Sequence, residues 1–286
     1  ASVPTIAILD TAIDMSQPKF QNSVVHEVCL IEIFFDSTPR CPNGLTSMEG
    51  PGAATLAKNK LSVGGFDHGT LMADQALQTN PNVKIVFIRI IGQRESGVRE
   101  YTNEATVYNA LQWVINNQSK FNIQSVAMAQ GSHALGVAGT DYCPKTPTTV
   151  EKVKSLNALN VGVFFPAGNN SDYKRVSWPS CIPETISMGA TMPAGSIAFY
   201  SNYDAKLIDF YARGTTVLYG LDAKKTNFAG TSASVLVGAT SWATIKSAKP
   251  NLTYTELYDL ISRTAAVTTS SRVGSGKLID VAKAIG

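Results

Sequence analysis

Residues 5–10, Thr5-Ile-Ala-Ile-Leu-Asp10, form an unbroken apolar run that ends in a carboxylate. Similar runs recur along the chain, at Lys84–Ile91, Ser125–Met128, Val161–Phe165 and Thr185–Thr191. A continuous apolar run of roughly four to eight residues is typical of a strand that is buried on both faces, and such strands belong to parallel sheets covered by helices. We therefore predict that each run is a strand of a mainly parallel sheet.

Helical patterns lie between and after these strands. Asn103–Asn117 carries apolar side chains at i, i+3, i+4 and i+7 spacing. Pro147 suits the first turn of a second helix, and Thr253 with Glu256 has the spacing of a capping box before a third. Strands alternating with helices predict an α/β fold, a three-layer α/β/α architecture around a mainly parallel central sheet. Because no linker rich in Pro, Gly or Ser divides the chain, we expect residues 1–286 to form a single domain.

The composition excludes several classes of protein. The 286 residues are 44% apolar and 16% charged, whereas disordered chains have few apolar residues and many charges. Basic residues exceed acidic residues by 24 − 21 = +3, so we expect neither nucleic acid nor an anionic membrane as a partner. No apolar stretch approaches the ~18 residues of a membrane span.

The N-terminus and the cysteines bear on the cellular location. Ala1-Ser2-Val3-Pro4 has neither the charged nor the long apolar part of a signal peptide, so the chain is either intracellular or mature. An even number of cysteines (Cys29, Cys41, Cys143 and Cys181) fits a secreted protein with disulfides, extracellular or periplasmic; the alternative is four independent buried thiols. No cysteine or histidine spacing fits a zinc site, and we expect no cofactor.

Any chemistry that needs histidine must use His26, His68 or His133, the three histidines of the chain. We interpret His26, in an apolar stretch, as a core or edge-strand residue, and His133 lies in a loop-like run. His68 stands at the start of an apolar helical pattern and precedes Gly69, next to which another backbone can approach closely. This position suits a general base, although a structural histidine is the alternative.

Two further side chains stand where α/β proteins hold ligands. Asp10 ends the first strand, and ligands gather outside the carboxyl ends of parallel strands; an Asx turn is the alternative. Ser232 opens an apolar helical run, and a helix N-terminus stabilises an anion; a simple N-cap would look similar. The chain order Asp10, His68, Ser232 is the order of the catalytic triad in subtilisin.

On these residues the chain resembles the subtilisin family (subtilases) of serine peptidases. Ile8-Leu9-Asp10-Thr11, His68-Gly69-Thr70 and Gly230-Thr231-Ser232 are similar to the three catalytic motifs of the family. Ala167-Gly168-Asn169 is similar to the motif whose Asn binds the oxyanion. Further similar segments follow in the family's order: Ser177-Trp-Pro-Ser180, Phe199-Tyr-Ser-Asn202 and Val273–Asp280.

The resemblance implies a subtilisin-like fold and a serine endopeptidase. Asp10, His68 and Ser232 would form the triad, and Asn169 would complete an oxyanion hole with the Ser232 N–H. Ala129–Gly131 would pair with an extended substrate as a β-strand. The residues that the resemblance assigns to substrate binding are Ala129, Gln130, Gly131, Ala167 and Gly168. The implied partners are a protein or peptide substrate and the chain's own cleaved pro-segment, as inhibitor and chaperone, and we expect a monomer.

The chain also departs from the family pattern. Ala12 replaces a Gly, Leu71 and Asp74 replace a His and a Gly, and Ala233–Leu236 replaces the usual Met-Ala-Ser/Thr-Pro. Ala127–Gly131 stands where the family often has Asn-x-Ser-x-Gly. These departures leave an alternative open, a non-catalytic subtilase-like binding or scaffold protein.

Four cysteines allow three connectivities, of which we predict Cys29–Cys41 and Cys143–Cys181. Cys29 and Cys41 flank a stretch, Asp36–Arg40, that must turn. Given the resemblance, Cys143 follows the substrate-pairing strand and Cys181 follows the oxyanion motif, so both belong near the cleft.

Many subtilases hold a calcium ion in a loop inserted after the catalytic histidine. Here Leu77–Val83 runs directly into the strand at Lys84, and no Asp or Glu lies between Asp74 and Arg94. Because calcium prefers six to eight oxygens, several of them from carboxylates, we expect this metal site to be missing. A different, weaker cation site among the scattered aspartates elsewhere in the chain is the alternative.

Overall fold

The computed structural model describes residues 3–32, 40–100, 102–132, 143 and 146–286. His133 and residues 36–39 of the expected turn lie outside them. The main sheet consists of β1 (Thr5–Asp10), β2 (Val24–Leu30), β3 (Ser47–Glu49), β4 (Lys84–Arg89), β5 (Ile123–Met128), β6 (Gly162–Pro166), β7 (Ile186–Thr191), β8 (Phe210–Arg213), β11 (Ala266–Ser270) and β12 (Gly274–Leu278). A separate ribbon pairs β9 (Thr215–Tyr219) with β10 (Lys225–Ala229), joined through a short 3₁₀ turn at Leu221–Ala223. The helices are α1 (Pro18–Ser23), α2 (Lys58–Leu61), α3 (His68–Thr79), α4 (Glu104–Phe121), α5 (Pro147–Ala158), α6 (Thr231–Ala248), α7 (Tyr254–Thr264) and α8 (Val281–Ile285).

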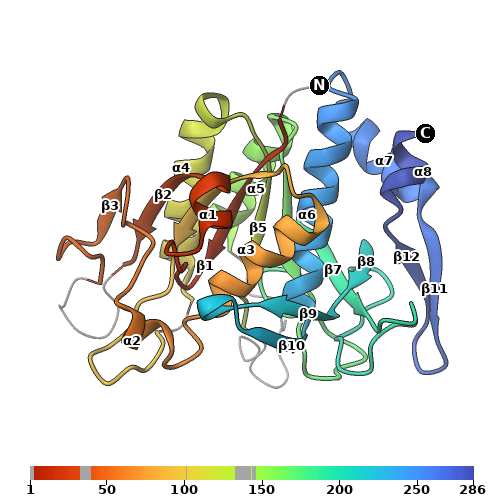
Figure 1. Cartoon of the computed structure of the whole chain (residues 1–286). Coiled ribbons are helices and arrows are strands. Elements are labelled where there is room, and N and C mark those ends of the chain that lie inside the picture. The colour runs from red at the N-terminus through yellow and green to blue at the C-terminus, as the bar shows by residue number, and fades with distance from the viewer. Residues whose placement is uncertain (1–2, 33–39, 101, 133–142, 144–145) are drawn as a thin grey trace.

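Within the described residues the main sheet has the strand order β11-β12-β8-β7-β6-β5-β1-β4-β2-β3 (Figure 1). All neighbouring pairs from β12 to β2 are parallel. Antiparallel pairs close the two edges, β11 with β12 and β2 with β3. The prediction of a mainly parallel sheet is therefore confirmed, and the five predicted runs form β1, β4, β5, β6 and β7.

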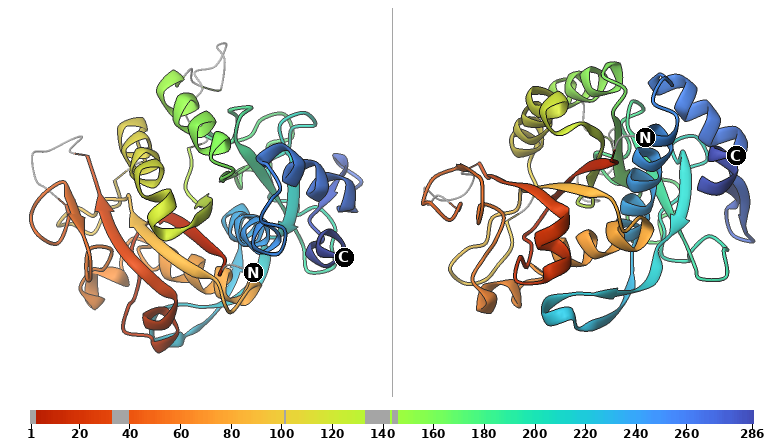
Figure 2. Two further views of the ribbon diagram at one scale, coloured as in Figure 1. Left: turned by 90° about the horizontal axis from the view of Figure 1, so that it is seen from above. Right: turned by 45° about the horizontal axis from the view of Figure 1, so that its top comes forward.

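Helices cover both faces of the sheet, so that the molecule has three layers (Figure 2). The alternation of side chains along β1 sends Ile6 and Ile8 into one core, together with α3 and α6. Ala7 and Leu9 face the opposite core, together with α4 and α5. Because both faces are buried, the central strands read as continuous apolar runs.

The predicted helix signals correspond to helix ends. Asn103 caps α4, its side chain accepting a hydrogen bond from the Thr106 N–H at 2.8 Å, and Asn122 ends the helix in the left-handed region at φ 52°. Pro147 is the first residue of α5. Thr253 and Glu256 form the predicted capping box at the start of α7.

His26 has structural surroundings. It lies in β2, the neighbour of the edge strand β3, and its ring stacks on Phe121 at 4.7 Å and on Trp113 at 5.7 Å between centroids. Its Nε2 atom lies 3.3 Å from a carboxylate oxygen of Glu49. These contacts agree with the interpretation of His26 as a residue that packs.

Both predicted disulfides, Cys29–Cys41 and Cys143–Cys181, are present. In the described part of the chain, no helix has the length and apolar character needed to cross a membrane.

Candidate active site

The candidate site lies where three neighbouring parallel strands end. β1, β5 and β6 are adjacent in the sheet. Asp10 is the last residue of β1, Ala129–Gly131 follows β5, and Ala167–Asn169 follows β6. Two helices begin at the same place, α3 with His68 and α6 with Thr231. Parallel topology thus gathers residues that are far apart in the sequence.

Asp10 and His68 form a hydrogen-bonded pair. His68 Nδ1 lies 2.8 Å from Asp10 Oδ1, and the same oxygen accepts from the Thr11 N–H at 2.7 Å and from Gln130 Nε2 at 3.0 Å. Asp10 is completely buried, which by itself would raise the pKa of its carboxyl. The charge and hydrogen bond of His68, the Thr11 N–H and the charge of Arg99 together outweigh burial and hold the pKa of Asp10 below its ordinary value.

A close packing contact fixes His68 beside Asp10. The Gly69 N–H donates to the Thr11 hydroxyl at 2.9 Å, and that hydroxyl donates to the Phe66 carbonyl at 2.9 Å. A Cβ atom at Gly69 would lie 2.4 Å from the Ala12 carbonyl oxygen, so only glycine fits here. The start of α3 is thereby locked against the end of β1, and the imidazole is held in place.

Ser232 is the second residue of α6, after the helix cap at Gly230. Its side chain is largely buried, and its hydroxyl donates to the Ala129 carbonyl at 3.1 Å. The hydroxyl lines the same cavity as His68. In this structure its hydrogen bond therefore goes to the segment after β5 rather than to the imidazole.

Asn169 is oriented by the residue that precedes Ser232. Its Oδ1 accepts from the Thr231 N–H at 2.8 Å and from the Thr231 hydroxyl at 2.9 Å. Since Oδ1 is occupied, the Nδ2 amide is the side-chain group left to donate to a bound molecule. Gly168 has φ +108°, and a Cβ there would lie 2.3 Å from Ser177 Oγ, so the Gly before Asn169 is required for this turn.

These residues surround a cavity of about 400 Å³. Its lining residues are His68, Arg99, Ala129, Gln130, Gly131, Pro166, Gly168, Asn169, Asn170, Ser177, Thr231 and Ser232. The cavity thus brings together His68, Asn169 and Ser232 with four of the five residues expected to bind substrate, while Asp10 lies behind His68. The size and the polar lining fit a segment of a peptide chain.

Two of the expected substrate-binding residues make other contacts in this structure. Ala167 is completely buried and is not part of the cavity wall, since its N–H donates to the Met188 carbonyl and its carbonyl accepts from Ser177. Ala167 thus lies behind the cavity wall in this structure, and its part in substrate binding stays a prediction. Gln130 does line the cavity, but its side chain is also bonded to Asp10.

The sequence reasoning missed Arg99, Pro166, Asn170 and Thr231 as cavity residues. Thr231 lies inside the Gly230-Thr231-Ser232 motif, and Asn170 directly follows the Ala167-Gly168-Asn169 motif. Their positions in the sequence therefore indicated that they lie near the site. Arg99 lies in a loop with no motif, and only the three-dimensional structure brings it to the cavity.

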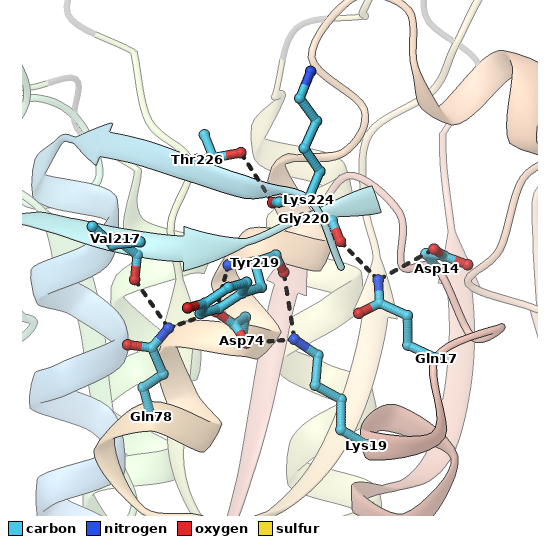
Figure 3. A network of polar contacts seen from close by, with 10 residues as sticks. All are labelled: Asp14, Gln17, Lys19, Asp74, Gln78, Val217, Tyr219, Gly220, Lys224 and Thr226. Carbon is cyan, nitrogen blue, oxygen red and sulfur yellow. Dashed lines mark hydrogen bonds and ion pairs between the residues drawn. The ribbon is translucent and has the colours of Figure 1, made fainter. Parts of the chain in front are cut away.

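The β9–β10 ribbon immediately precedes α6, the helix that carries Ser232. Polar contacts join this ribbon to residues at the start of α1 and in α3 (Figure 3). Asp74 of α3 accepts from the Tyr219 N–H at 2.8 Å, from Gln78 Nε2 at 2.7 Å and from Lys19 Nζ at 2.5 Å. Gln17 Nε2 donates to the Gly220 carbonyl at 2.8 Å. The ribbon is therefore tied to both α1 and α3.

Within the described ranges, His, Cys, Asp and Glu side chains form no group of three or more that could hold a metal ion. Asp74, at the start of the segment considered for calcium, forms an ion pair with Lys19.

The chain is similar in sequence to known serine proteases. The family model described as the subtilase family matches residues 2–277. A cuticle-degrading serine protease of Arthrobotrys oligospora is 25% identical over 221 residues, which are 75% of this chain and 44% of that protein. The major intracellular serine protease of Bacillus subtilis is 26% identical over 227 residues, 77% of this chain and 60% of that protein. The chain thus spans about half the length of these relatives.

The fold is similar to solved structures over nearly the whole chain. Proteases from Pseudoalteromonas arctica align with a TM-score of 0.76 at 19% identity, covering 98% of this chain and 88% of that chain. At this identity the likeness concerns the fold, and it agrees with the three-layer architecture around a mainly parallel sheet.

Proposed function

Because this chain belongs to the subtilase family, we propose that it is a serine endopeptidase that hydrolyses peptide bonds in proteins or peptides. The observation that carries the proposal is that His68 and Ser232 line one cavity, while Asp10 lies behind His68 and is hydrogen-bonded to it at 2.8 Å. We also propose that residues 1–286 act as one peptidase domain.

In the proposed mechanism the Ser232 hydroxyl leaves the Ala129 carbonyl and turns to His68 when substrate enters. Catalytic hydrogen bonds are often long or misaligned before substrate binds. Neutral His68 takes the hydroxyl proton as Ser232 Oγ attacks the scissile carbonyl carbon, and then gives that proton to the leaving amine. Asp10 stays ionised, holds the Nδ1–H tautomer and stabilises the imidazolium. Water then repeats the sequence on the acyl-enzyme.

The negative oxygen of the tetrahedral intermediate would be bound by two donors. Asn169 Nδ2 is one, because Thr231 occupies Oδ1. The Ser232 backbone N–H, in the first turn of α6, is the other. Donors that are fixed before the reaction lower the barrier without a cost of reorganisation.

Substrate would bind as an extended strand along Ala129–Gly131, opposite Gly168. We further propose that the protein acts as a monomer and is secreted. Its proposed partners are a protein or peptide substrate and its own cleaved pro-segment, which binds the same cleft as an inhibitor. Secretion is supported by the two disulfides, which persist in oxidising compartments. The relative from Bacillus subtilis is intracellular by name, so location is best tested directly by fractionation.

A non-catalytic binding or scaffold protein is the second candidate. The observation that favours it is the Ser232 hydrogen bond to Ala129, which gives the hydroxyl a partner other than His68. A fluorophosphonate probe separates the two candidates, since it reacts only with an activated serine hydroxyl. We expect the probe to label the wild type and to leave Ser232→Ala unlabelled.

The same pair of proteins tests peptidase activity. We expect the wild type to cleave a peptide library and Ser232→Ala to lose nearly all cleavage with an unchanged circular dichroism spectrum. Residual cleavage by Ser232→Ala within about tenfold of the wild type would contradict the mechanism, since removal of a triad nucleophile costs far more.

A further inference from the structure

The cavity carries one permanent charge on its described lining residues, the guanidinium of Arg99. No Asp or Glu belongs to that lining, and Asp10 lies behind His68, completely buried. A cleft whose lining has one sign of charge concentrates the electric field of that charge on a bound molecule. The lining is therefore suited to a negatively charged group.

Arg99 is held in place by a small hairpin. The Arg94 N–H donates to the Val98 carbonyl at 3.0 Å, and the Glu100 N–H donates to the Gly92 carbonyl at 2.9 Å. Gln93 pairs with Arg99 in a β-bridge and ties the hairpin to the Lys60 carbonyl at 2.9 Å. The arginine thus projects from a braced turn, which lowers the entropy lost when it binds a ligand.

The side chain of Arg99 is also anchored at its tip. Nη2 donates to Gln130 Oε1, and the amide of the same Gln130 donates to Asp10 Oδ1 at 3.0 Å. A chain of contacts therefore fixes the guanidinium relative to the Asp10–His68 pair. A group that binds Arg99 would lie close to the scissile bond.

The guanidinium retains capacity for a ligand. Arginine has five N–H donors, and Gln130 accepts from one nitrogen. The neighbouring Glu100 pairs with Arg40 Nε at 3.1 Å. Asp10, whose pKa the charge of Arg99 helps to lower, is joined to Arg99 through Gln130. Arg99 is half-buried at the cavity, where a charge-assisted hydrogen bond is stronger than in open solvent.

From these contacts we infer that Arg99 is a specificity-determining residue that binds an acidic side chain, Asp or Glu, of the substrate within a few residues of the scissile bond. The inference rests on the proposed peptidase function and adds a substrate class to it: acidic peptides. Arg99 acts on binding and takes no part in the bond-breaking steps.

The cleavage experiment uses pairs of peptides that differ only in Glu against Gln, placed in turn at four positions on each side of the cleaved bond. For each pair the ratio of kcat/KM for Glu over Gln is measured with the wild type, Arg99→Gln, Arg99→Lys and Arg99→Glu. Arg263→Gln, which removes an exposed charge in the last turn of α7, is the matched control. Both peptides of a pair meet the same triad, so the ratio cancels any effect of a variant on the Asp10–His68 pair.

We expect a ratio of about five to ten at one position for the wild type and for Arg263→Gln, as for a partly exposed charge-assisted contact. The ratio should fall to about one in Arg99→Gln, stay above one in Arg99→Lys and fall below one in Arg99→Glu, where the substituted carboxylate repels the Glu peptide. Added salt should lower the wild-type ratio, because it screens an exposed charge pair. A ratio near one at all positions, or a preference that survives Arg99→Gln, would overturn the inference.

A binding experiment separates this inference from the proposed function. Fluorescence anisotropy measures binding of the same labelled peptides to the Ser232→Ala protein, with and without Arg99→Gln. Arg99-dependent preference for Glu in binding, without any cleavage by the wild type, would support the subsite and contradict the peptidase. Cleavage without this preference would contradict the subsite alone, and the absence of both cleavage and preferential binding would contradict both.

Discussion

At the scale of single residues, Asn169 has one group left with which to act. Thr231 occupies its Oδ1 with two hydrogen bonds, so Nδ2 is the side-chain group left to donate to a ligand. We expect Asn169→Ala to lower kcat by about 10²–10³-fold, the effect found for such a donor in a subtilisin, with a small change in KM. Steady-state kinetics on one peptide substrate measure both constants.

The neighbouring Asn170 supplies the control for that experiment. Asn170 also lines the cavity, but its fixed contact is a backbone N–H donated to Asn202 Oδ1 at 2.8 Å, which Asn170→Ala would keep. We expect Asn170→Ala to act on KM more than on kcat. Equal losses of kcat in both variants would mean that Asn169 has no special role.

The candidate site was predictable wherever local sequence carries the chemistry. Asp10, His68 and Ser232 each stand at a strand end or a helix start, beside residues whose small size the geometry demands, such as Gly69. Arg99 gave no such signal, because its place at the cavity depends on contacts with Gln130, 31 residues away. Long-range contacts of this kind leave no local pattern in the sequence.

At the scale of elements, Asp74 explains one departure from the family pattern. Its buried carboxylate accepts three hydrogen bonds and joins α3 to Lys19 and to the Tyr219 N–H of β9. We expect Asp74→Ala to lower the free energy of unfolding by about 2 kcal/mol, because it leaves these donors without their acceptor. Urea unfolding measures this loss, and hydrogen exchange at Tyr219 should become faster.

Lys58→Ala is the control for Asp74→Ala. Lys58 pairs with Asp222 in the turn of the same ribbon, but both side chains are mostly exposed. Such pairs contribute little to stability because water and salt screen them. We expect unfolding of Lys58→Ala to match the wild type, and an equal loss in both variants would contradict a special role for the buried contact.

Asp209 links three elements, and its raised pKa predicts that the stability of the protein depends on pH. Its carboxylate accepts from the Ser187 N–H of β7 at 2.7 Å and from the Tyr258 hydroxyl of α7 at 2.6 Å, just before β8. Burial raises the pKa of Asp209 from 3.8 to about 6. Between these values the folded protein binds a proton that the unfolded chain has released, so stability falls as pH rises through this window.

Ionisation of Asp209 should lower the free energy of unfolding by about 3 kcal/mol between pH 3.8 and pH 7, since each pKa unit corresponds to ~1.4 kcal/mol. Asp209→Asn cannot ionise and should lack this dependence. Urea unfolding at pH 4.5, 5.5 and 7 should therefore show the wild type losing stability relative to Asp209→Asn as pH rises. Parallel pH curves for the two proteins would contradict the raised pKa.

Elements with a strong apolar period were predictable, and those held by tertiary contacts were not. β9 and β10 have mostly half-exposed residues and no apolar run, and β12 contains Gly274 and Gly276. α1 has six residues, too few for a helical period to be recognised. β2 contains His26 and Glu27, polar residues that interrupt an apolar pattern.

At the scale of the whole molecule, parallel topology explains why the fold could be inferred from five strands. β1, β4, β5, β6 and β7 are the buried centre of the sheet, and their runs are apolar because helices cover both faces. The edge strands differ from the central strands. β3 and β11 pair antiparallel with their neighbours and bury few side chains. The part of the fold that could not be predicted is therefore the periphery. There the strands face solvent, and they need no continuous apolar run.

The two disulfides cross-link the molecule over different lengths of chain, and this difference leads to a prediction about stability. Cys143–Cys181 closes a separation of 38 residues and Cys29–Cys41 a separation of 12. In the chain-entropy description a longer closed loop restricts the unfolded state more, which corresponds to about 4 kcal/mol for the first disulfide and about 3 kcal/mol for the second. The double variant Cys143→Ala/Cys181→Ala should therefore be less stable in urea than Cys29→Ala/Cys41→Ala.

The position of each disulfide adds a second difference between these variants. Cys181 follows Ser177 and Trp178, and Ser177 lines the cavity, whereas Cys29 and Cys41 pack in a separate small core with Ile31 and Ala53. Loss of Cys143–Cys181 should thus also raise KM for peptide substrates, and loss of Cys29–Cys41 should leave KM unchanged. If both variants lost stability but kept the wild-type KM, the bridge at the cavity would serve folding alone. If the variant without Cys29–Cys41 were the less stable one, loop length would not determine what each bridge contributes, and strain or residual structure in the unfolded chain would have to account for the difference.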